Sequence, residues 1–242
     1  MGQRRANRFA RRRLIQRRVD HPRLIILRRL ADSLLSTLLG SPCAVCARVL
    51  DRPLSGAVCD DCWSRIVPPA PPFHGTRFIS TAAAIGEYDG VLREIIHALK
   101  YQGRRSTAPR LSALMAMHGR DVLATADAVV PVPLHRTRER ARGFNQAEEL
   151  ARGLGLPVQL ALRRVRITQP QVDLPAGDRH SNVKDAFAAA GCGSTFAGKI
   201  LVLVDDVTTT GATLEACARV LSEAGAQEVR ALTAARVSCV PR

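Results

Sequence analysis

One stretch in the C-terminal third of the chain constrains its fold more than any other. Five consecutive apolar residues, Ile200 to Val204, lead directly into the sequence Asp-Asp-Val-Thr-Thr-Thr-Gly-Ala-Thr. A continuous apolar run of this length is typical of a strand that is buried on both faces of a parallel sheet. The residues from Leu214 to Ala224 favour a helix that ends at Gly225 as its C-cap. The stretch therefore predicts a strand, a polar loop and a helix in an α/β fold.

The polar loop has the residue types that hold a sugar phosphate. Backbone N–H groups at a helix N-terminus bind phosphate, and here a glycine and several hydroxyl side chains accompany them. These residues are Thr208, Thr209, Thr210, Gly211 and Thr213. Asp205 and Asp206 would repel a phosphate, so we expect them to face ribose hydroxyls or Mg²⁺. A ribose 5-phosphate satisfies both halves, whereas the alternative is a core strand followed by a threonine-rich cap and two solvated acids.

The loop contains neither the G-x-x-x-x-G-K-[ST] pattern of nucleotide triphosphatases nor the G-x-G-x-x-G pattern of dinucleotide-binding folds. It resembles instead the phosphoribosyl-pyrophosphate (PRPP) motif of the type I phosphoribosyltransferases. Further blocks narrow the resemblance to the ComF family of competence-related phosphoribosyltransferase-like proteins. In chain order these blocks are Cys43-x-x-Cys46 with Cys59-x-x-Cys62, Tyr88 to Tyr101, Val130 to Arg136, Arg142 to Gln146, and Thr168 to Phe187. The resemblance covers the chain from about Leu30 to its end.

This resemblance implies an α/β fold with a type I phosphoribosyltransferase-like parallel sheet flanked by helices, preceded by a small Cys₄ zinc ribbon. It also implies a PRPP-binding protein that transfers phosphoribosyl to an unidentified acceptor with release of pyrophosphate, with Mg²⁺ accompanying PRPP. The family context is DNA uptake or the use of DNA-derived nucleotides. Two other functions stay open: a non-catalytic module that senses PRPP or a nucleotide, and an adaptor that handles DNA with a helicase-like competence partner.

The resemblance further implies a pyrophosphate-binding loop after an apolar strand expected over residues 128–132. Guanidinium groups suit a diphosphate, and Arg136 is the first candidate because it is nearest to the strand end. The alternative is a solvated basic loop that precedes a helix over residues 145–154. Lys100 follows a helix expected over residues 92–99, and the family block suggests that it reaches the pyrophosphate.

The polar stretch between Arg163 and Phe187 is either a disordered connection or a functional lid. By resemblance it matches the mobile loop that closes over PRPP and keeps water from its reactive carbon. Its candidate ligand contacts are Thr168, Gln171, Arg179 and Asn182, with Arg179 grouped among the candidate catalytic residues.

Two C-x-x-C pairs account for four of the seven cysteines. Cys43 and Cys46 are separated from Cys59 and Cys62 by twelve residues, a spacing that matches a Cys₄ zinc ribbon. Because the metal would use all four thiolates, the site is expected to be structural. Two disulfides or a redox C-x-x-C are the less favoured alternatives. Cys217, on the helix after the polar loop, is expected to be a buried apolar residue.

The positive charge is concentrated at the N-terminus. Residues 1–30 contain eleven Arg and one Asp, a balance of +10, which leaves +5 of the net +15 for the rest of the chain. Disorder is the first expectation for this arm, and attraction to a polyanion such as single-stranded DNA is the second. Because no uninterrupted apolar stretch follows the arginines, we expect a cytoplasmic protein without membrane insertion.

The predicted organisation has four parts. An arginine-rich arm over residues 1–29 precedes an amphipathic helix and zinc ribbon over residues 30–67. A proline-rich linker over residues 68–77 then leads to a phosphoribosyltransferase-like domain over residues 78–242. A chain of 242 residues is long enough for one α/β domain and a small module.

Overall fold

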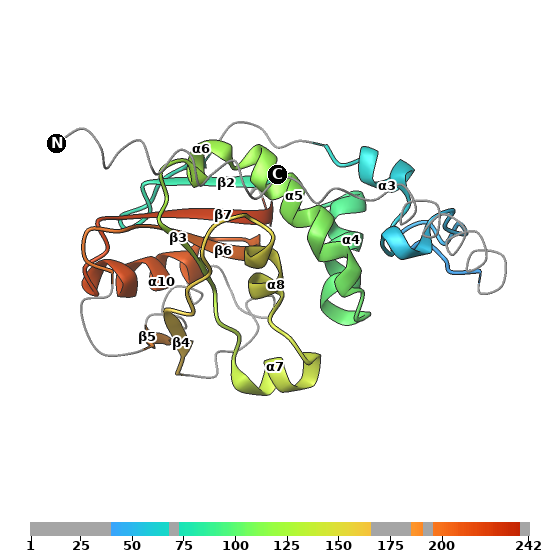
Figure 1. Ribbon diagram of the computed structural model, residues 1–242. Coiled ribbons are helices and arrows are strands. Elements are labelled where there is room, and N and C mark those ends of the chain that lie inside the picture. The colour runs from blue at the N-terminus through green and yellow to red at the C-terminus, as the bar shows by residue number, and fades with distance from the viewer. Residues whose placement is uncertain (1–39, 68–72, 166–184, 191–195, 238–242) are drawn as a thin grey trace, which may run out of the picture.

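The centre of the molecule is a five-stranded sheet in the order β1-β2-β7-β6-β3 (Figure 1). The computed structural model describes residues 40–67, 73–165, 185–190 and 196–237. The strands of this sheet are β1 Phe73–His74, β2 Thr81–Glu87, β3 Ala128–Pro131, β6 Ile200–Thr208 and β7 Glu228–Arg236. β2, β7, β6 and β3 run parallel, and β1 pairs antiparallel with β2. The predicted parallel sheet is confirmed.

Helices cover both faces of the sheet, as expected for an α/β fold. α4 Gly90–Tyr101, α5 Ala108–His118 and α8 Gln146–Arg152 contribute to the hydrophobic cluster on one face. α10 Ala212–Glu223 packs on the other face with a hairpin of β4 Leu162–Arg164 and β5 Phe187–Ala189. The remaining helices are α3 Asp60–Ser64, α6 Arg120–Leu123, α7 Arg136–Arg142 and the 3₁₀ turns Pro53–Ser55 and Arg105–Thr107. In the described ranges, no helix has the length and hydropathy needed to span a membrane.

The central strand β6 is buried on both faces. Val202 and Val204 face α4, α5 and α8, whereas Leu201 and Leu203 face α10. All four side chains are fully buried, and each such burial stabilises the fold by about 1.5–3 kcal/mol. The strand continues four residues beyond the predicted end, to Thr208, because this polar part still pairs with β7. The acidic residues therefore lie inside the sheet rather than after it.

The arginine-rich segment after β3 is a helix and not the predicted loop. His135 Nδ1 accepts the N–H of Thr137 at 3.2 Å at the start of α7, and Gly143 ends the helix with a φ of 80°. Arginine and glutamate favour helices, so a polar segment with a cap at each end adopts one without an apolar face. Arg136 thus stands at the first turn of a helix.

The cysteine-bearing segment shares the core of the main domain. Trp63 and Val58 belong to the same hydrophobic cluster as α4 and α5. The Arg110 guanidinium of α5 lies 5.1 Å from the centroid of the Trp63 ring and also pairs with Asp60. In Figure 1 this segment, which contains α3, lies beside α4 and α5. The predicted arm over residues 1–29, the first part of the predicted helix and ribbon over residues 30–39, and residues 68–72 of the predicted linker lie outside the described residues.

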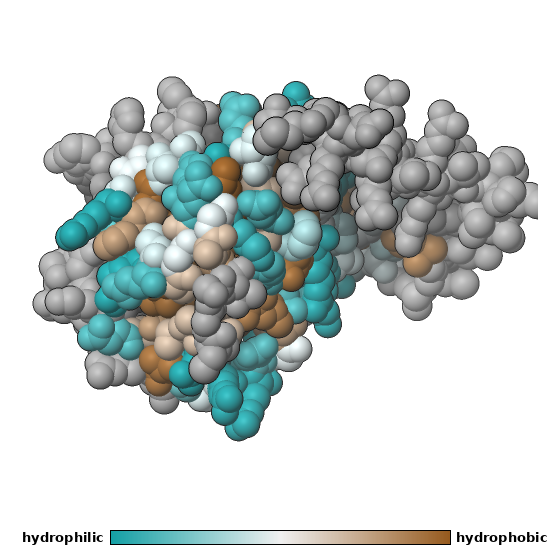
Figure 2. Space-filling model, turned by 60° about the vertical axis from the view of Figure 1, so that its left-hand side comes forward, coloured by the Kyte–Doolittle hydropathy of each residue, from teal (hydrophilic) through white to brown (hydrophobic). Residues whose placement is uncertain are grey.

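The described part of the face drawn in Figure 2 is a mixture of hydrophilic, intermediate and hydrophobic residues. Where side chains are described there, apolar patches are small and are separated by polar residues. The large apolar side chains that are exposed, such as Met117 and Leu160, are scattered along the chain. Such single exposed apolar residues are ordinary for a folded domain.

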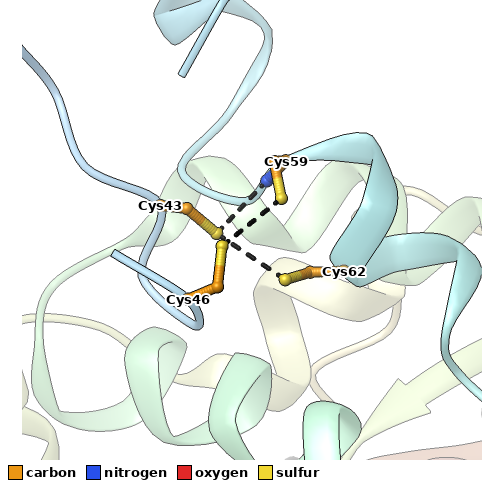
Figure 3. Close-up of side chains that lie close together, drawn as sticks. All are labelled: Cys43, Cys46, Cys59 and Cys62. Carbon is orange, nitrogen blue, oxygen red and sulfur yellow. Dashed lines mark hydrogen bonds between the residues drawn. The ribbon is translucent and has the colours of Figure 1, made fainter. Parts of the chain in front are cut away.

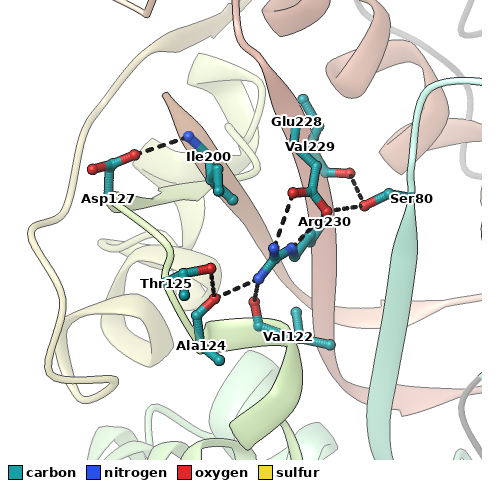
Figure 4. Close-up of polar contacts among 9 residues, drawn as sticks. All are labelled: Ser80, Val122, Ala124, Thr125, Asp127, Ile200, Glu228, Val229 and Arg230. Carbon is teal, nitrogen blue, oxygen red and sulfur yellow. Dashed lines mark hydrogen bonds and ion pairs between the residues drawn. The ribbon is translucent and has the colours of Figure 1, made fainter. Parts of the chain in front are cut away.

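Arg230 joins β7 to α6 at the amino-terminal edge of the sheet (Figure 4). It donates to both carboxylate oxygens of Glu228, at 2.8 and 2.9 Å. It also donates to the carbonyl oxygens of Val122 at 3.1 Å and Ala124 at 2.5 Å, where the C-terminal end of α6 favours a positive charge. One arginine therefore satisfies four acceptor atoms at a site that is only 13% exposed.

We expect Arg230→Ala to lower the free energy of unfolding by about 1.5–3 kcal/mol, the usual range for hydrogen bonds that involve a charged group. Arg230→Lys keeps the charge but loses the planar fork, so its loss should be smaller. Urea unfolding of both variants measures this. Arg219→Ala, which removes pairs with more exposed acids, is the matched control. Equal losses for Arg230→Ala and Arg219→Ala would contradict the role given to Arg230.

Candidate functional site

A hollow of about 200 Å³ lies at the carboxyl edge of the sheet, between the ends of β3 and β6. The segment after β3 crosses the α8 face of the sheet, whereas the segment after β6 crosses the α10 face. Ligands of open α/β sheets bind where successive crossovers diverge in this way. The charged residues that line the hollow are Lys100, Arg138, Arg142, Arg164, Asp205 and Asp206. Four cations against two acids favour an anionic ligand.

Asp206 and Lys100 form a buried ion pair in this hollow. Lys100 Nζ lies 2.9 Å from Asp206 Oδ1, and the side chains are 15% and 5% exposed. Burial alone would lower the pKa of Lys100, but the charge and hydrogen bond of Asp206 raise it, so the lysine stays charged. The other oxygen, Asp206 Oδ2, is buried and has no hydrogen-bond partner among the described residues. Its hydrogen-bonding capacity is therefore not used by the described residues.

Side chains along β6 alternate between the two faces of the sheet. Asp205 therefore lies on the face opposite to Asp206, the face of Leu201 and Leu203 towards α10. Its Oδ1 accepts the backbone N–H of Asp206 at 2.8 Å. Burial and then the charge of Asp206 raise the pKa of Asp205 to about 7, although Lys100 and Arg164 act in the opposite direction. The two neighbouring acids therefore differ in their electrostatic environment.

The threonine loop lies at the N-terminus of α10, beside the hollow. Gly211 is the N-cap and has a φ of 76°, a left-handed conformation that glycine adopts without strain. A Cβ at Gly211 would meet no atom within 4 Å, so the backbone conformation rather than crowding accounts for the glycine. The N–H of Ala212 donates to Thr210 Oγ1 at 3.4 Å, and Thr213 lines the hollow. Thr208 is buried, whereas Thr209 is exposed.

α7 brings Arg138 and Arg142 to the hollow, while Arg136 is not among the lining residues. Residues four apart share one face of a helix, so this pair would have been found if the helix had been recognised from the sequence. Arg142 donates to Gln146 and lies 5.3 Å from the ring centroid of Tyr101. These contacts orient its guanidinium at the edge of the hollow.

Asn145 fixes the segment between β3 and α8. Its Oδ1 accepts the N–H of Ala147 at 3.0 Å as the N-cap of α8, and its Nδ2 donates to the carbonyl of Val132 at 3.0 Å. The residue was part of a recognised sequence block, but its structural role was not predicted. An asparagine followed by a helix is an N-cap signal, although the tie to Val132 depends on the fold.

The predicted lid falls outside the described residues. This applies to all four of its candidate residues, Thr168, Gln171, Arg179 and Asn182. The described residues that flank it, Arg164 and Phe187, are paired in the β4–β5 hairpin. Arg164 also lines the hollow, so the stretch begins and ends near the candidate site.

The four cysteines predicted to bind zinc lie together (Figure 3). Their sulfur atoms are all within 4.8 Å of one another. Cys43 Sγ is 4.0 Å from Cys62 Sγ, and Cys46 Sγ is 3.7 Å from Cys59 Sγ. A tetrahedral ion with 2.3 Å bonds to sulfur requires sulfur separations of about 3.8 Å. The cluster therefore fits a four-coordinate metal ion.

Cys217 is fully buried on α10, as predicted. Burial raises the pKa of its thiol. Another hollow, of about 190 Å³, lies beside the cysteine cluster. Its arginines pair with its own acids, as Arg48 does with Asp61 and Arg52 with Asp60, so the hollow beside β6 is the stronger candidate site.

Comparison with known proteins agrees with this geometry. Residues 140–239 match the family model of the phosphoribosyl transferase domain. Competence protein F of Haemophilus influenzae is 35% identical over 162 residues, which are 63% of this chain and 71% of that protein. The DNA utilization protein YhgH of Salmonella typhi is 32% identical over 208 residues, which are 78% of this chain and 87% of that protein.

Solved structures with some similarity include the glutamine PRPP amidotransferase of B. subtilis, at 24% identity and a TM-score of 0.35. That match covers 52% of this chain but only 26% of the amidotransferase chain. The purine phosphoribosyltransferase of Pyrococcus horikoshii has 24% identity and a TM-score of 0.32, with 55% and 76% coverage. The sequence relatives carry the assignment: the chain belongs to the ComF family of competence-related phosphoribosyltransferase-like proteins.

Proposed function

We propose that the hollow binds PRPP or another ligand that contains ribose 5-phosphate, and that the protein transfers the phosphoribosyl group to an acceptor. The observation that carries this proposal is Asp206 Oδ2, a buried carboxylate oxygen without a partner among the described residues. Buried polar atoms are rarely left without a hydrogen bond, so a donor from a ligand is the natural complement. A ribose hydroxyl is such a donor.

The other parts of the ligand follow from the charges. Its 5-phosphate lies in the loop from Thr208 to Thr213, where the N-terminus of α10 supplies N–H groups. Its pyrophosphate faces Arg138 and Arg142 on α7, with Arg136 at the start of the same helix. Mg²⁺, which the family resemblance implies, would be bound to the pyrophosphate group of the ligand and would neutralise part of its charge.

The reaction requires no nucleophile from the protein. The acceptor forms a bond to carbon 1 of the ribose while the bond from that carbon to pyrophosphate breaks, and pyrophosphate leaves with the electron pair. The arginines stabilise the charge that develops on the departing group, while Asp206 holds the ribose in place. The residues of the predicted lid, including Arg179, would exclude water from the site.

An association with DNA remains a separate part of the proposal. Relatives are named for competence and for DNA utilization. The N-terminal arm has a balance of +10 and suits a polyanion such as single-stranded DNA. A helicase-like competence partner, a purely sensing role and a cytoplasmic location also stay predictions.

Substitutions at Asp206 and in the loop that contains Gly211 should weaken ligand binding to different extents. Asp206→Asn removes one charged acceptor and should weaken binding of ribose 5-phosphate by about 1–3 kcal/mol. Gly211→Val forces a β-branched residue into a left-handed conformation, so the loop should change shape and binding should be lost. Calorimetric titration with ribose 5-phosphate and with PRPP measures both effects.

Gly225→Val is the matched control for Gly211→Val. Gly225 follows the other end of α10 and has a φ of 94°, so it produces similar backbone strain away from the hollow. We expect this control to lose stability but to keep its ligand affinity. If folded Gly211→Val and Asp206→Asn both bound ribose 5-phosphate as the unchanged protein does, the proposal would be wrong.

We also propose that the cysteine cluster holds one structural Zn²⁺ per chain. With all four thiolates engaged, the ion has no open position for catalysis and stabilises the fold. Protein purified without chelators should contain one equivalent of zinc by elemental analysis. Cys59→Ser should lose the metal and unfold residues 41–66, which hydrogen exchange would detect, whereas Cys217→Ser should keep the zinc. Metal-free but fully folded protein would contradict this assignment.

The raised pKa of Asp205 predicts a pH dependence of stability. With a pKa of about 7 in the folded protein and an ordinary value of 3.8, the folded state holds a proton that the unfolded state has released. Stability should therefore fall as the pH rises from about 4 to 7. Asp205→Asn keeps an acceptor for the Asp206 N–H and should flatten this dependence. Urea unfolding at pH 5 and pH 8 tests it; the same decline in both proteins would exclude Asp205 as the cause.

A further inference from the structure

The two acids of β6 do not form a divalent-ion site as they stand. Asp206 Oδ1 already accepts a hydrogen bond from Lys100 Nζ at 2.9 Å, and Asp205 Oδ1 accepts the Asp206 N–H at 2.8 Å. Mg²⁺ needs a near-octahedral set of oxygens at about 2.0–2.1 Å. An ammonium group bound to the same carboxylate would repel it. The donor set thus disagrees with a protein-bound Mg²⁺ at these two residues.

Lys100 is held in this position by its helix. It lies in the last turn of α4, next to Leu99, which is fully buried in the main core, as is Ile96 one turn earlier. Its Nζ also lies 6.0 Å from the centroid of the Tyr88 ring. A buried lysine with these neighbours is a fixed charge rather than a mobile surface group.

We propose that Lys100 is the resident cation at the ribose end of the site and takes the place that a divalent ion would have beside Asp206. It neutralises Asp206 and holds its Oδ1, which leaves Oδ2, the oxygen without a partner among the described residues, as the acceptor for a ribose hydroxyl. Lys100 is then a positioning residue that acts through Asp206. This inference rests on the proposed function and deepens it: only the pyrophosphate part of a ligand brings Mg²⁺.

Calorimetric titration with ribose 5-phosphate, which lacks the pyrophosphate, tests the inference. The unchanged protein should bind it equally well with and without millimolar Mg²⁺; a buffer free of divalent ions is used because a chelator could remove zinc. Without Mg²⁺, Lys100→Met should bind about 10-fold to 100-fold more weakly, and added Mg²⁺ should restore part of the affinity. Lys100→Arg keeps the charge and should lose less. Lys199→Met, at the residue just before the amino-terminal end of β6 and away from the hollow, is the matched control and should bind normally.

A titration with Mg²⁺ alone separates this inference from the proposed function. The unchanged protein should show no binding at the aspartates, whereas Lys100→Met should take up Mg²⁺ and the double variant with Asp206→Asn should not. If the wild-type protein failed to bind ribose 5-phosphate, the proposed function would be wrong. The titration with Mg²⁺ alone would still decide whether Lys100 keeps a divalent ion away from Asp206. Should Lys100→Met not fold by circular dichroism, Lys100→Gln replaces it. Two results would overturn the inference. One is equal Mg²⁺ uptake by Lys100→Met and the wild-type protein. The other is a requirement for Mg²⁺ when the wild-type protein binds ribose 5-phosphate.

Discussion

The ion pair between Lys100 and Asp206 is the contact on which the candidate site depends. β6 continues from the apolar core directly into acids, which brings a carboxylate to a position that is only 4% exposed. An ionised group at such a position costs several kcal/mol unless a partner compensates it, and removal of that partner is strongly destabilising. Lys100 compensates one oxygen and leaves the other for a ligand. The same contact therefore stabilises the fold and, in the proposed function, sets where a ribose hydroxyl binds.

The position of Lys100 depends in turn on packing far from the hollow. α4 and α5 belong to one hydrophobic cluster, and Trp63 of the cysteine segment belongs to it as well. Arg110 of α5 contacts both the Trp63 ring and Asp60. A structural metal at the cysteines would thus support the helices that carry Lys100, without any contact between the metal and the ligand. This packing would connect the proposed metal module to the proposed sugar phosphate site through one hydrophobic core.

Local patterns in the sequence were sufficient for the strand, the threonine loop and the cysteine cluster. The apolar run that ends at Val204 favoured a buried strand, and the spacing of the cysteines favoured a Cys₄ metal site over two disulfides or a redox pair. The pairing of Lys100 with Asp206 could not be predicted, because it depends on how α4 lies across the sheet. α7 was missed because it has no apolar periodicity, and with it the placement of Arg138 and Arg142 at the hollow. Tertiary contacts and polar helices are the features for which a single sequence has the weakest signal.

A crystal structure of the protein with ribose 5-phosphate would show whether Asp206 holds the ribose. We expect the phosphate against the N-terminus of α10, in the loop that contains Gly211, and a ribose hydroxyl within hydrogen-bond distance of Asp206 Oδ2. We also expect the contact between Lys100 and Asp206 Oδ1 to be retained in the complex. A ligand bound elsewhere, or an Asp206 that turns away from the ribose while the loop keeps its shape, would contradict this expectation.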